Sequence, residues 1–164
     1  MIRFETSHGD FIVELFEKDA PLSAANFLQY VEDGFFDGTI FHRIVPGVVI
    51  QGGGLTADFD QKKTRTPVKN EATNGVRNQR GSLSMARTND IHSATSQFFV
   101  NLVDNDFLDH SPGNYGYAVF GRVTEGMDDV DKIAKVRTGR RKGYTDAPME
   151  DVIIKSARRV EKAK

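Results

Sequence analysis

Short runs in which apolar and polar residues alternate recur along the 164 residues of this chain. A period of two is typical of β-strands with one buried face. The clearest example, residues 2–16, predicts a hairpin whose turn lies at Gly9-Asp10. Further strand-like runs follow at residues 39–45, 48–51, 82–86, 97–102, 117–123 and 151–160. Together they predict eight strands and a mainly β fold.

Helical spacing of apolar residues is found in two places. The first, residues 21–34, follows Asp19, which can cap it, and has Pro21 in its first turn. Its expected inward face is Leu22, Ala25, Leu28 and Val31. The second, residues 127–136, is expected to place Val130 and Ile133 inward. Because no strand–helix–strand alternation occurs, the sequence predicts a closed eight-stranded antiparallel β-barrel capped by two α-helices, as one domain over residues 1–164.

Composition excludes several classes of protein. The chain has no cysteine, which excludes disulfides, cysteine-zinc sites and thiol nucleophiles. A net charge of −1 gives no overall field to attract nucleic acid or an acidic membrane, so we expect the basic segments 137–142 and 155–164 to be solvated surface. No apolar run approaches the roughly 20 residues of a membrane span. No targeting segment is visible, and the expected location is cytoplasmic.

Metal and phosphate sites are not predicted either. The four histidines are scattered without an i, i+4 pair, and Gly52-Gly53-Gly54 lacks the Gly-Lys-Ser/Thr of a phosphate loop. These glycines are expected where backbone turns or approaches a ligand closely. Residues 52–80 show little periodicity, and a loop of that length is expected to be functional. We therefore expect no cofactor, no metal and no covalent intermediate.

One group of polar residues is unusual for strands. Arg43 lies inside an apolar run, Gln51 ends the next run, and Gln97 stands two positions before Phe99. If these strands are neighbouring barrel walls, the four side chains share one face. The alternative is that each is an exposed strand residue. An arginine among apolar side chains has to find acceptors, because desolvation of a guanidinium is costly.

Five longer motifs cover much of the chain: FHRIVPGVVIQGGG (41–54), SMAR (84–87), SQFFVN (96–101), DFLD (106–109) and YAVFGRVTEGMDDVDKI (117–133). They resemble the motifs of the cyclophilins, most closely of the short bacterial cytoplasmic type, and the resemblance extends over essentially the whole chain. It implies an eight-stranded barrel with two helices and peptidyl-prolyl cis–trans isomerase activity without a cofactor. Proline-containing peptides and unfolded or partly folded protein clients are the implied partners.

The resemblance assigns roles to ten residues. Arg43 matches the catalytic arginine, and Gln51 matches the glutamine that holds this arginine and the substrate backbone. The implied substrate-binding residues are Val48, Ala86, Arg87, Gln97, Phe99, Phe107, Leu108 and Tyr117. Among them, Phe99 and Leu108 match the proline pocket, with Gln97 beside it, while Ala86 and Arg87 match the stretch that pairs with an extended peptide.

Four of these positions depart from the pattern of the family. Arg87 stands where asparagine is usual, Phe107 where many members have tryptophan, and Tyr117 where many have histidine. Val48 stands where a pocket phenylalanine is usual, so it is the departure that bears on the depth of the predicted pocket. Without the indole N–H of a tryptophan, a cyclosporin-type ligand is expected to bind weakly.

Two other functions remain open at this stage. Val48 leaves open a proline-peptide binding module without catalysis, although Arg43 and Gln51 disfavour this function. A hollow barrel for a small apolar ligand is disfavoured by the twelve phenylalanines, which suit a filled barrel. For the isomerase we expect a monomer, with Arg43 stabilising the twisted amide and an apolar cradle of Phe99, Leu108 and Val48 holding the proline ring.

Overall fold

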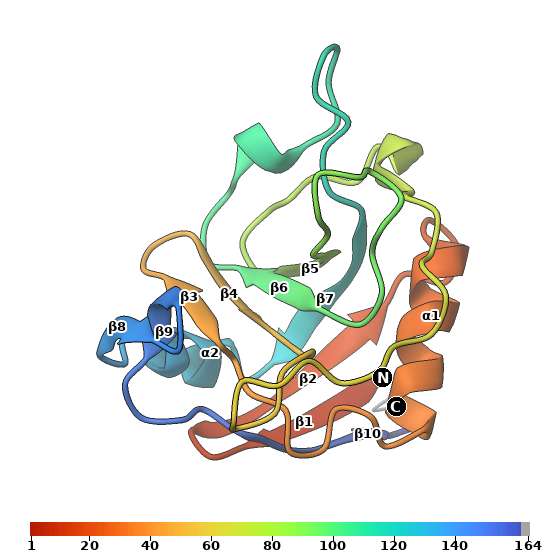
Figure 1. The fold of residues 1–164 in the computed structure, drawn as a ribbon. Helices are drawn as coiled ribbons and strands as arrows, with labels where there is room; N and C mark the ends of the chain where they lie inside the picture. The colour runs from red at the N-terminus through yellow and green to blue at the C-terminus, as the bar shows by residue number, and fades with distance from the viewer. Residues whose placement is uncertain (162–164) are drawn as a thin grey trace.

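The computed structural model describes residues 1–161 and shows a strongly curved antiparallel sheet with two helices (Figure 1). Eight strands form this sheet in the order β10-β1-β2-β7-β5-β6-β4-β3. Their bounds are β1 Ile2–Thr6, β2 Gly9–Leu15, β3 Arg43–Val45, β4 Val49–Gly52, β5 Ser82–Met85, β6 Phe98–Asn101, β7 Val119–Glu125 and β10 Ile154–Arg159. The helices are α1 Pro21–Glu32 and α2 Met127–Ala134, with short 3-10 turns at Ala72–Asn74 and Asp106–Leu108. The predicted fold class is confirmed.

Closure of the barrel is weaker than the sequence predicted. The end strands of the sheet are β10 and β3, and the segments before them meet at an isolated bridge between Ile40 and Ile153. Backbone hydrogen bonds around it join Phe41 N–H to the Val152 carbonyl at 3.0 Å and Ile154 N–H to the Thr39 carbonyl at 2.8 Å. The sheet is therefore a half-barrel whose ends meet through this bridge, and not the fully closed barrel that the sequence predicted.

Phenylalanine rings fill the interior. Phe4 stacks on Phe11 with ring centroids 4.9 Å apart, and Phe98 meets Phe27 edge-on at 5.3 Å. These rings are fully buried in one large apolar cluster that also takes in Phe36. Such pairs stabilise a core beyond their buried area. A filled interior disfavours the alternative of a hollow ligand carrier.

The inward face of α1 differs from the predicted one. Pro21 does begin the helix, but its N-cap is Ala20, and no side chain among the described residues caps it. The buried residues are Ser23, Ala24, Phe27, Tyr30 and Val31, whereas Leu22 and Ala25 are exposed. Of the predicted face, Val31 is buried and Leu28 partly so. In α2, by contrast, Val130 and Ile133 are buried as predicted.

The opening hairpin turns two residues earlier than expected. Thr6 pairs with Gly9, so Ser7 and His8 form the turn and Gly9 lies inside β2. Gly9 has a φ of +116°, and a Cβ there would collide with Asp129 of α2. The Asp129 carboxylate accepts a hydrogen bond from Asp10 N–H at 3.2 Å. The glycine therefore makes room for a helix instead of supplying the turn.

A second hairpin was missed from the sequence. Strands β8 Thr138–Arg141 and β9 Tyr144–Pro148 pair in a separate two-stranded sheet, and β9 packs beside β3 (Figure 1). The turn residues Lys142 and Gly143 both have positive φ, as a tight hairpin turn requires. The basic segment 137–142 is thus largely strand, and residues 162–164 of the predicted basic tail lie outside the described residues. Within residues 1–161, no helix has the length and apolar character needed to cross a membrane.

Candidate active site on the outer wall of the barrel

Three predicted site residues lie in one row across neighbouring strands. Arg43 of β3 pairs with Gln51 of β4, and Gln51 pairs with Phe99 of β6. Residues that pair directly across an antiparallel sheet project to the same face. We call Arg43, Gln51 and Phe99 the outer row. The prediction that four side chains share a face is confirmed for these three, and the fourth, Gln97, accepts a hydrogen bond from Gln51 Nε2 at 3.0 Å.

The neighbouring row explains why this face points away from the core. Ile44, Ile50 and Val100 pair with one another one residue further along the same strands, and all three are fully buried. Successive side chains of a strand point to opposite faces. Because the isoleucines and the valine are committed to the interior, the outer row is placed on the outside of the barrel wall.

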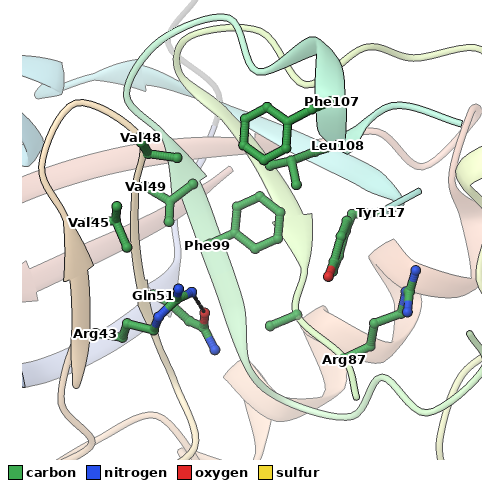
Figure 2. Close-up of a pocket in the computed structure, with 11 residues that line it drawn as sticks. Arg43, Val45, Val48, Val49, Gln51, Arg87, Phe99, Phe107, Leu108 and Tyr117 are labelled. Atoms are coloured by element: carbon green, nitrogen blue, oxygen red, sulfur yellow. Dashed lines mark hydrogen bonds between the residues drawn. The ribbon is translucent and has the colours of Figure 1, made fainter. Parts of the chain in front are cut away.

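The outer row borders a cavity of about 560 Å³ (Figure 2). Its lining residues are Arg43, Val45, Val48, Val49, Gln51, Ala86, Arg87, Phe99, Phe107, Leu108 and Tyr117. Nine of the ten predicted site residues are among them. The tenth, Gln97, lines an adjoining smaller cavity of about 200 Å³ together with Gln51 and Arg87. Sequence reasoning missed Val45 and Val49, although both continue the outward alternation of Arg43 and Gln51.

The floor of the cavity is apolar. Phe99, Val49 and Ala86 are buried and form a small cluster separate from the main core. Tyr117 meets Phe99 edge-on at a centroid distance of 5.6 Å. Phe107 lies at the rim and is 66% exposed, which leaves its ring free to contact a ligand. The cavity thus combines an apolar floor with a guanidinium at one edge.

Arg87 borders both cavities and is held by backbone carbonyls. Its Nε and Nη2 donate to the Gly116 carbonyl at 3.3 and 3.0 Å, and its Nη1 donates to the Thr88 carbonyl at 2.9 Å. The guanidinium also stacks over Tyr117 at 4.5 Å from the ring centroid. This side chain therefore fixes the Tyr117 wall of the cleft.

A buried asparagine network, also missed from the sequence, positions the loop of residues 102–109, which carries the cavity residues Phe107 and Leu108. Asn105 Nδ2 donates to the Val48 carbonyl at 3.0 Å and to Asn101 Oδ1 at 2.8 Å. Asn78 Nδ2 donates to the Leu108 carbonyl at 3.2 Å and to the Asp109 carboxylate at 2.9 Å. The asparagines are almost fully buried. The only sequence signal for them is a polar residue at the end of an apolar strand, as in FFVN.

His42 lies next to Arg43 but on the buried side of the wall. It is 4% exposed, and its Nδ1 has no hydrogen-bond partner among residues 1–161. The Tyr144 ring of the second hairpin meets it edge-on at 5.6 Å. Burial, aided by the charge of Arg43, lowers the pKa of His42 from 6.5 to about 4. His42 is therefore neutral at physiological pH, and Arg43 is the cation at this edge.

The side chains that could ligate a metal ion are dispersed in the part of the chain that the structure describes. Within residues 1–161, no group of three or more His, Asp or Glu side chains is arranged to hold a metal ion. The expectation of a reaction without a cofactor stays a prediction. What the arrangement can do is bind an apolar group on Phe99 and present N–H donors from Arg43 beside it.

A filled β-barrel with an apolar cleft on its outer wall and a guanidinium at the edge defines a protein that binds its ligand on its surface. A sequence model of the family "Cyclophilin type peptidyl-prolyl cis-trans isomerase/CLD" matches residues 1–159. The chain is 52% identical over 160 residues to peptidyl-prolyl cis-trans isomerase cyp18 of Streptomyces antibioticus, covering 96% of each protein. It is also 52% identical over 159 residues to peptidyl-prolyl cis-trans isomerase B of Escherichia coli K12, covering 95% of this chain and 97% of that one.

A solved structure agrees with these sequence relatives. The cyclophilin type peptidyl-prolyl cis-trans isomerase of Cryptosporidium parvum, determined in the presence of the dipeptide Ala-Pro, matches with a TM-score of 0.80 and 26% identity. The match covers 98% of this chain and 99% of that one. The chain therefore belongs to the cyclophilin-type peptidyl-prolyl cis-trans isomerases, and it is an enzyme of that class.

Proposed function

We propose that this enzyme catalyses rotation about Xaa-Pro bonds through Arg43, and that it assists protein folding in this way. The observation that carries the proposal is the outer row. It places the Arg43 guanidinium and the Phe99 ring on one face, joined by Gln51, which pairs with both residues across the strands. The reaction needs no nucleophile and no acid–base pair.

The barrier to be lowered comes from amide resonance. The nitrogen lone pair is delocalised into the carbonyl, so rotation costs about 18–20 kcal/mol. For Xaa-Pro bonds the cis isomer is roughly 0.5–1 kcal/mol above trans, yet uncatalysed exchange takes tens to hundreds of seconds. In the twisted state the lone pair returns to nitrogen and becomes a hydrogen-bond acceptor. An N–H of Arg43 that reaches this nitrogen stabilises the twisted state more than either planar isomer.

The apolar floor contributes in two ways. Phe99 and Leu108, with Val48 at the edge, offer a surface on which the proline ring can pack. A poorly solvated wall also disfavours the charge-separated planar amide relative to the twisted one. Gln51 Oε1 accepts a hydrogen bond from Arg43 Nη1 at 3.5 Å, a long bond that can tighten when substrate binds. It directs the planar fork of the guanidinium toward the cleft.

The proposed partners are proline-containing peptides and unfolded or partly folded chains. The Cryptosporidium parvum relative was determined with Ala-Pro, which supports a proline peptide as the ligand of the equivalent cleft. Unfolded chains expose such peptides, so a chaperone-like role in folding follows from the same cleft. The single-domain organisation, the monomeric state, the cytoplasmic location and weak binding of a cyclosporin-type ligand stay predictions.

The test is kinetic and uses prolyl peptides in a protease-coupled assay. Arg43→Ala is expected to lower kcat/KM about 100-fold, the order found when a transition-state donor is removed. Arg43→Lys should recover only part of the loss, because an ammonium lacks the planar fork. Arg140→Ala, at an exposed position on β8, is the control and should retain parent activity. Near-parent turnover of folded Arg43→Ala would refute the proposed role.

Folding assistance requires its own experiment. A protein whose refolding is limited by a slow prolyl phase should refold faster with the parent enzyme and at the uncatalysed rate with Arg43→Ala. Binding of unfolded chains without acceleration by the parent would favour the alternative, a proline-peptide binding module.

A further inference from the structure

A chain of side-chain amides connects Arg43 to the loop after β4. Gln51 Nε2 donates to Gln97 Oε1 at 3.0 Å, and Gln97 Nε2 donates to Gln61 Oε1 at 3.2 Å. Gln61 Nε2 in turn donates to the carbonyls of Gly54 and Lys62 at 3.1 and 2.9 Å. The chain runs from Arg43 through three glutamines to two backbone carbonyls, and we call it the glutamine relay.

The two carbonyls give the relay a direction. An amide nitrogen carries two protons and an amide oxygen carries none, so the end of Gln61 that faces Gly54 and Lys62 has to be Nε2. Its Oε1 then faces Gln97 and accepts from that side chain. Each amide fixes the orientation of the next, and the last one, Gln51, turns its oxygen toward Arg43. A reversed Gln51 would place NH₂ against the guanidinium, donor against donor.

Backbone geometry around Gly54 makes room for the relay. A Cβ on Gly54 would lie 2.5 Å from Gln97 Cγ, so only glycine lets the amide of Gln97 reach Gln61. The Gly54 carbonyl also accepts a hydrogen bond from Lys62 N–H at 3.0 Å, which closes the small loop that carries Gln61. This accounts for the third residue of the glycine run. The close approach at Gly54 is to the Gln97 side chain of the protein itself, whereas the sequence predicted a turn or an approach to a ligand.

We propose that Gln61 is a positioning residue for catalysis. It touches neither Arg43 nor the Phe99 floor, and it acts by setting the orientation of the relay so that Gln51 offers an acceptor to the guanidinium. The Gln61 side chain is exposed at the rim of the smaller cavity. Its amide is therefore held in place by three hydrogen bonds and not by burial. The inference rests on the proposed function of Arg43. It gives a specific role to the loop of residues 52–80, which the sequence predicted to be functional without indicating how.

Three substitutions of Gln61 distinguish an effect on the orientation of the relay amides from a general effect on protein stability. Gln61→Met is of similar size and carries no amide, so it frees the relay, and kcat should fall about two- to tenfold, the range of one net hydrogen bond. Gln61→Lys offers donors alone and should reverse Gln97 and Gln51, which lowers kcat further than Met does. Gln61→Glu keeps an acceptor for Gln97 Nε2 but loses both hydrogen bonds to the Gly54 and Lys62 carbonyls, so its kcat should lie between those of the parent and of Gln61→Met. KM should change less than kcat throughout the series.

The controls address charge and stability. The assays are repeated at about 0.5 M salt, where the field of a new surface charge is largely screened but the relay is not. Gln79→Met, at an exposed glutamine outside the relay, should match the parent. Side-chain ¹⁵N–¹H NMR should show the Gln97 and Gln51 amide signals moving in Gln61→Met and staying in Gln79→Met.

Arg43→Ala, assayed alongside, distinguishes two kinds of failure. If it keeps near-parent kcat, the proposed function fails and the relay inference fails with it. If it loses kcat but the Gln61 variants follow their melting temperatures, or no longer differ in the order Glu, Met, Lys at about 0.5 M salt, the relay inference alone is overturned. The expected result is loss in Arg43→Ala together with that order.

Discussion

His42 should make the stability of the enzyme depend on pH in a window where few other groups titrate. Its side chain is 4% exposed, its Nδ1 is unpartnered among the described residues, and Arg43 follows it in the chain. The pKa is lowered to about 4 in the folded enzyme, from 6.5 in an exposed histidine. The unfolded chain therefore binds a proton between these two values, whereas the folded enzyme does not.

The sign and size follow from linkage. Because the unfolded state binds more protons, stability rises with pH in this window, and the contribution of His42 is fully present above pH 6.5. It is lost as the pH falls toward 4, and between pH 7 and pH 4 the loss amounts to about 3 kcal/mol. That is a large part of the roughly 5–15 kcal/mol that stabilises an ordinary domain.

Urea unfolding of the parent and of His42→Leu at pH 7, 6, 5 and 4 tests this. The carboxylates are common to both proteins and cancel in the difference, so the parent should lose about 3 kcal/mol relative to the variant across the series. His8→Asn, in the turn of the opening hairpin, is the control and should follow the parent. A difference between parent and His42→Leu that stays constant with pH would refute the argument that His42 is held neutral.

Three further predictions concern the cleft and its cover. Val48→Phe should raise kcat/KM about fivefold, because about 40 Å² of added apolar contact with the proline is worth roughly 1 kcal/mol. An unchanged rate with an unchanged melting temperature would show that residue 48 does not contact substrate. Asn105→Ala should lower the free energy of unfolding in urea by about 1–3 kcal/mol, because Asn101 Oδ1 loses its donor in a fully buried site. An unchanged free energy of unfolding would mean that the asparagine network does not hold the loop of residues 102–109. Phe107→Trp should tighten binding of a cyclosporin-type ligand about two- to tenfold by calorimetry through a new indole N–H donor, and equal affinities would place the exposed residue 107 outside that binding surface.

The outer row could be predicted because alternation fixes the face of a strand. Once Ile44 and Ile50 are assigned to the core, Arg43 and Gln51 have to point outward. Their pairing with Phe99 requires the strand order, which alternation does not contain and the family resemblance implied. For the three strands that carry the outer row, local pattern and resemblance together were therefore sufficient, whereas the turn of the opening hairpin and the closure of the sheet were not predicted correctly.

The inward face of α1 could not be predicted in the same way. Leu22 and Ala25 fit helical spacing as well as Ala24 and Phe27 do. Which stripe is buried depends on how the helix lies against β7 and β10, and those contacts are long-range. Propensity and periodicity are weak compared with such tertiary packing.

The second hairpin and the polar networks were missed for a related reason. Strands β8 and β9 are mostly polar, so alternation gives no signal, and Lys142-Gly143 is a weaker turn signal than Asn-Gly. Gln61 reaches Gln97 across 36 residues, and Asn101 reaches Asn78 across 23. Contacts of this kind become visible once the chain is folded, because nothing in the local sequence marks the partner.

The role of Arg43 is tested most directly by the rate of cis–trans exchange on the enzyme. NMR exchange spectroscopy of an Xaa-Pro peptide gives this rate, and titration of the same samples gives Kd for the parent and for Arg43→Ala. We predict that on-enzyme exchange falls by at least about tenfold in the variant while Kd changes by less than about threefold, because the guanidinium acts in the twisted state. Equal exchange rates in parent and variant, with both proteins folded, would contradict this mechanism, and so would a loss of exchange fully accounted for by lost binding.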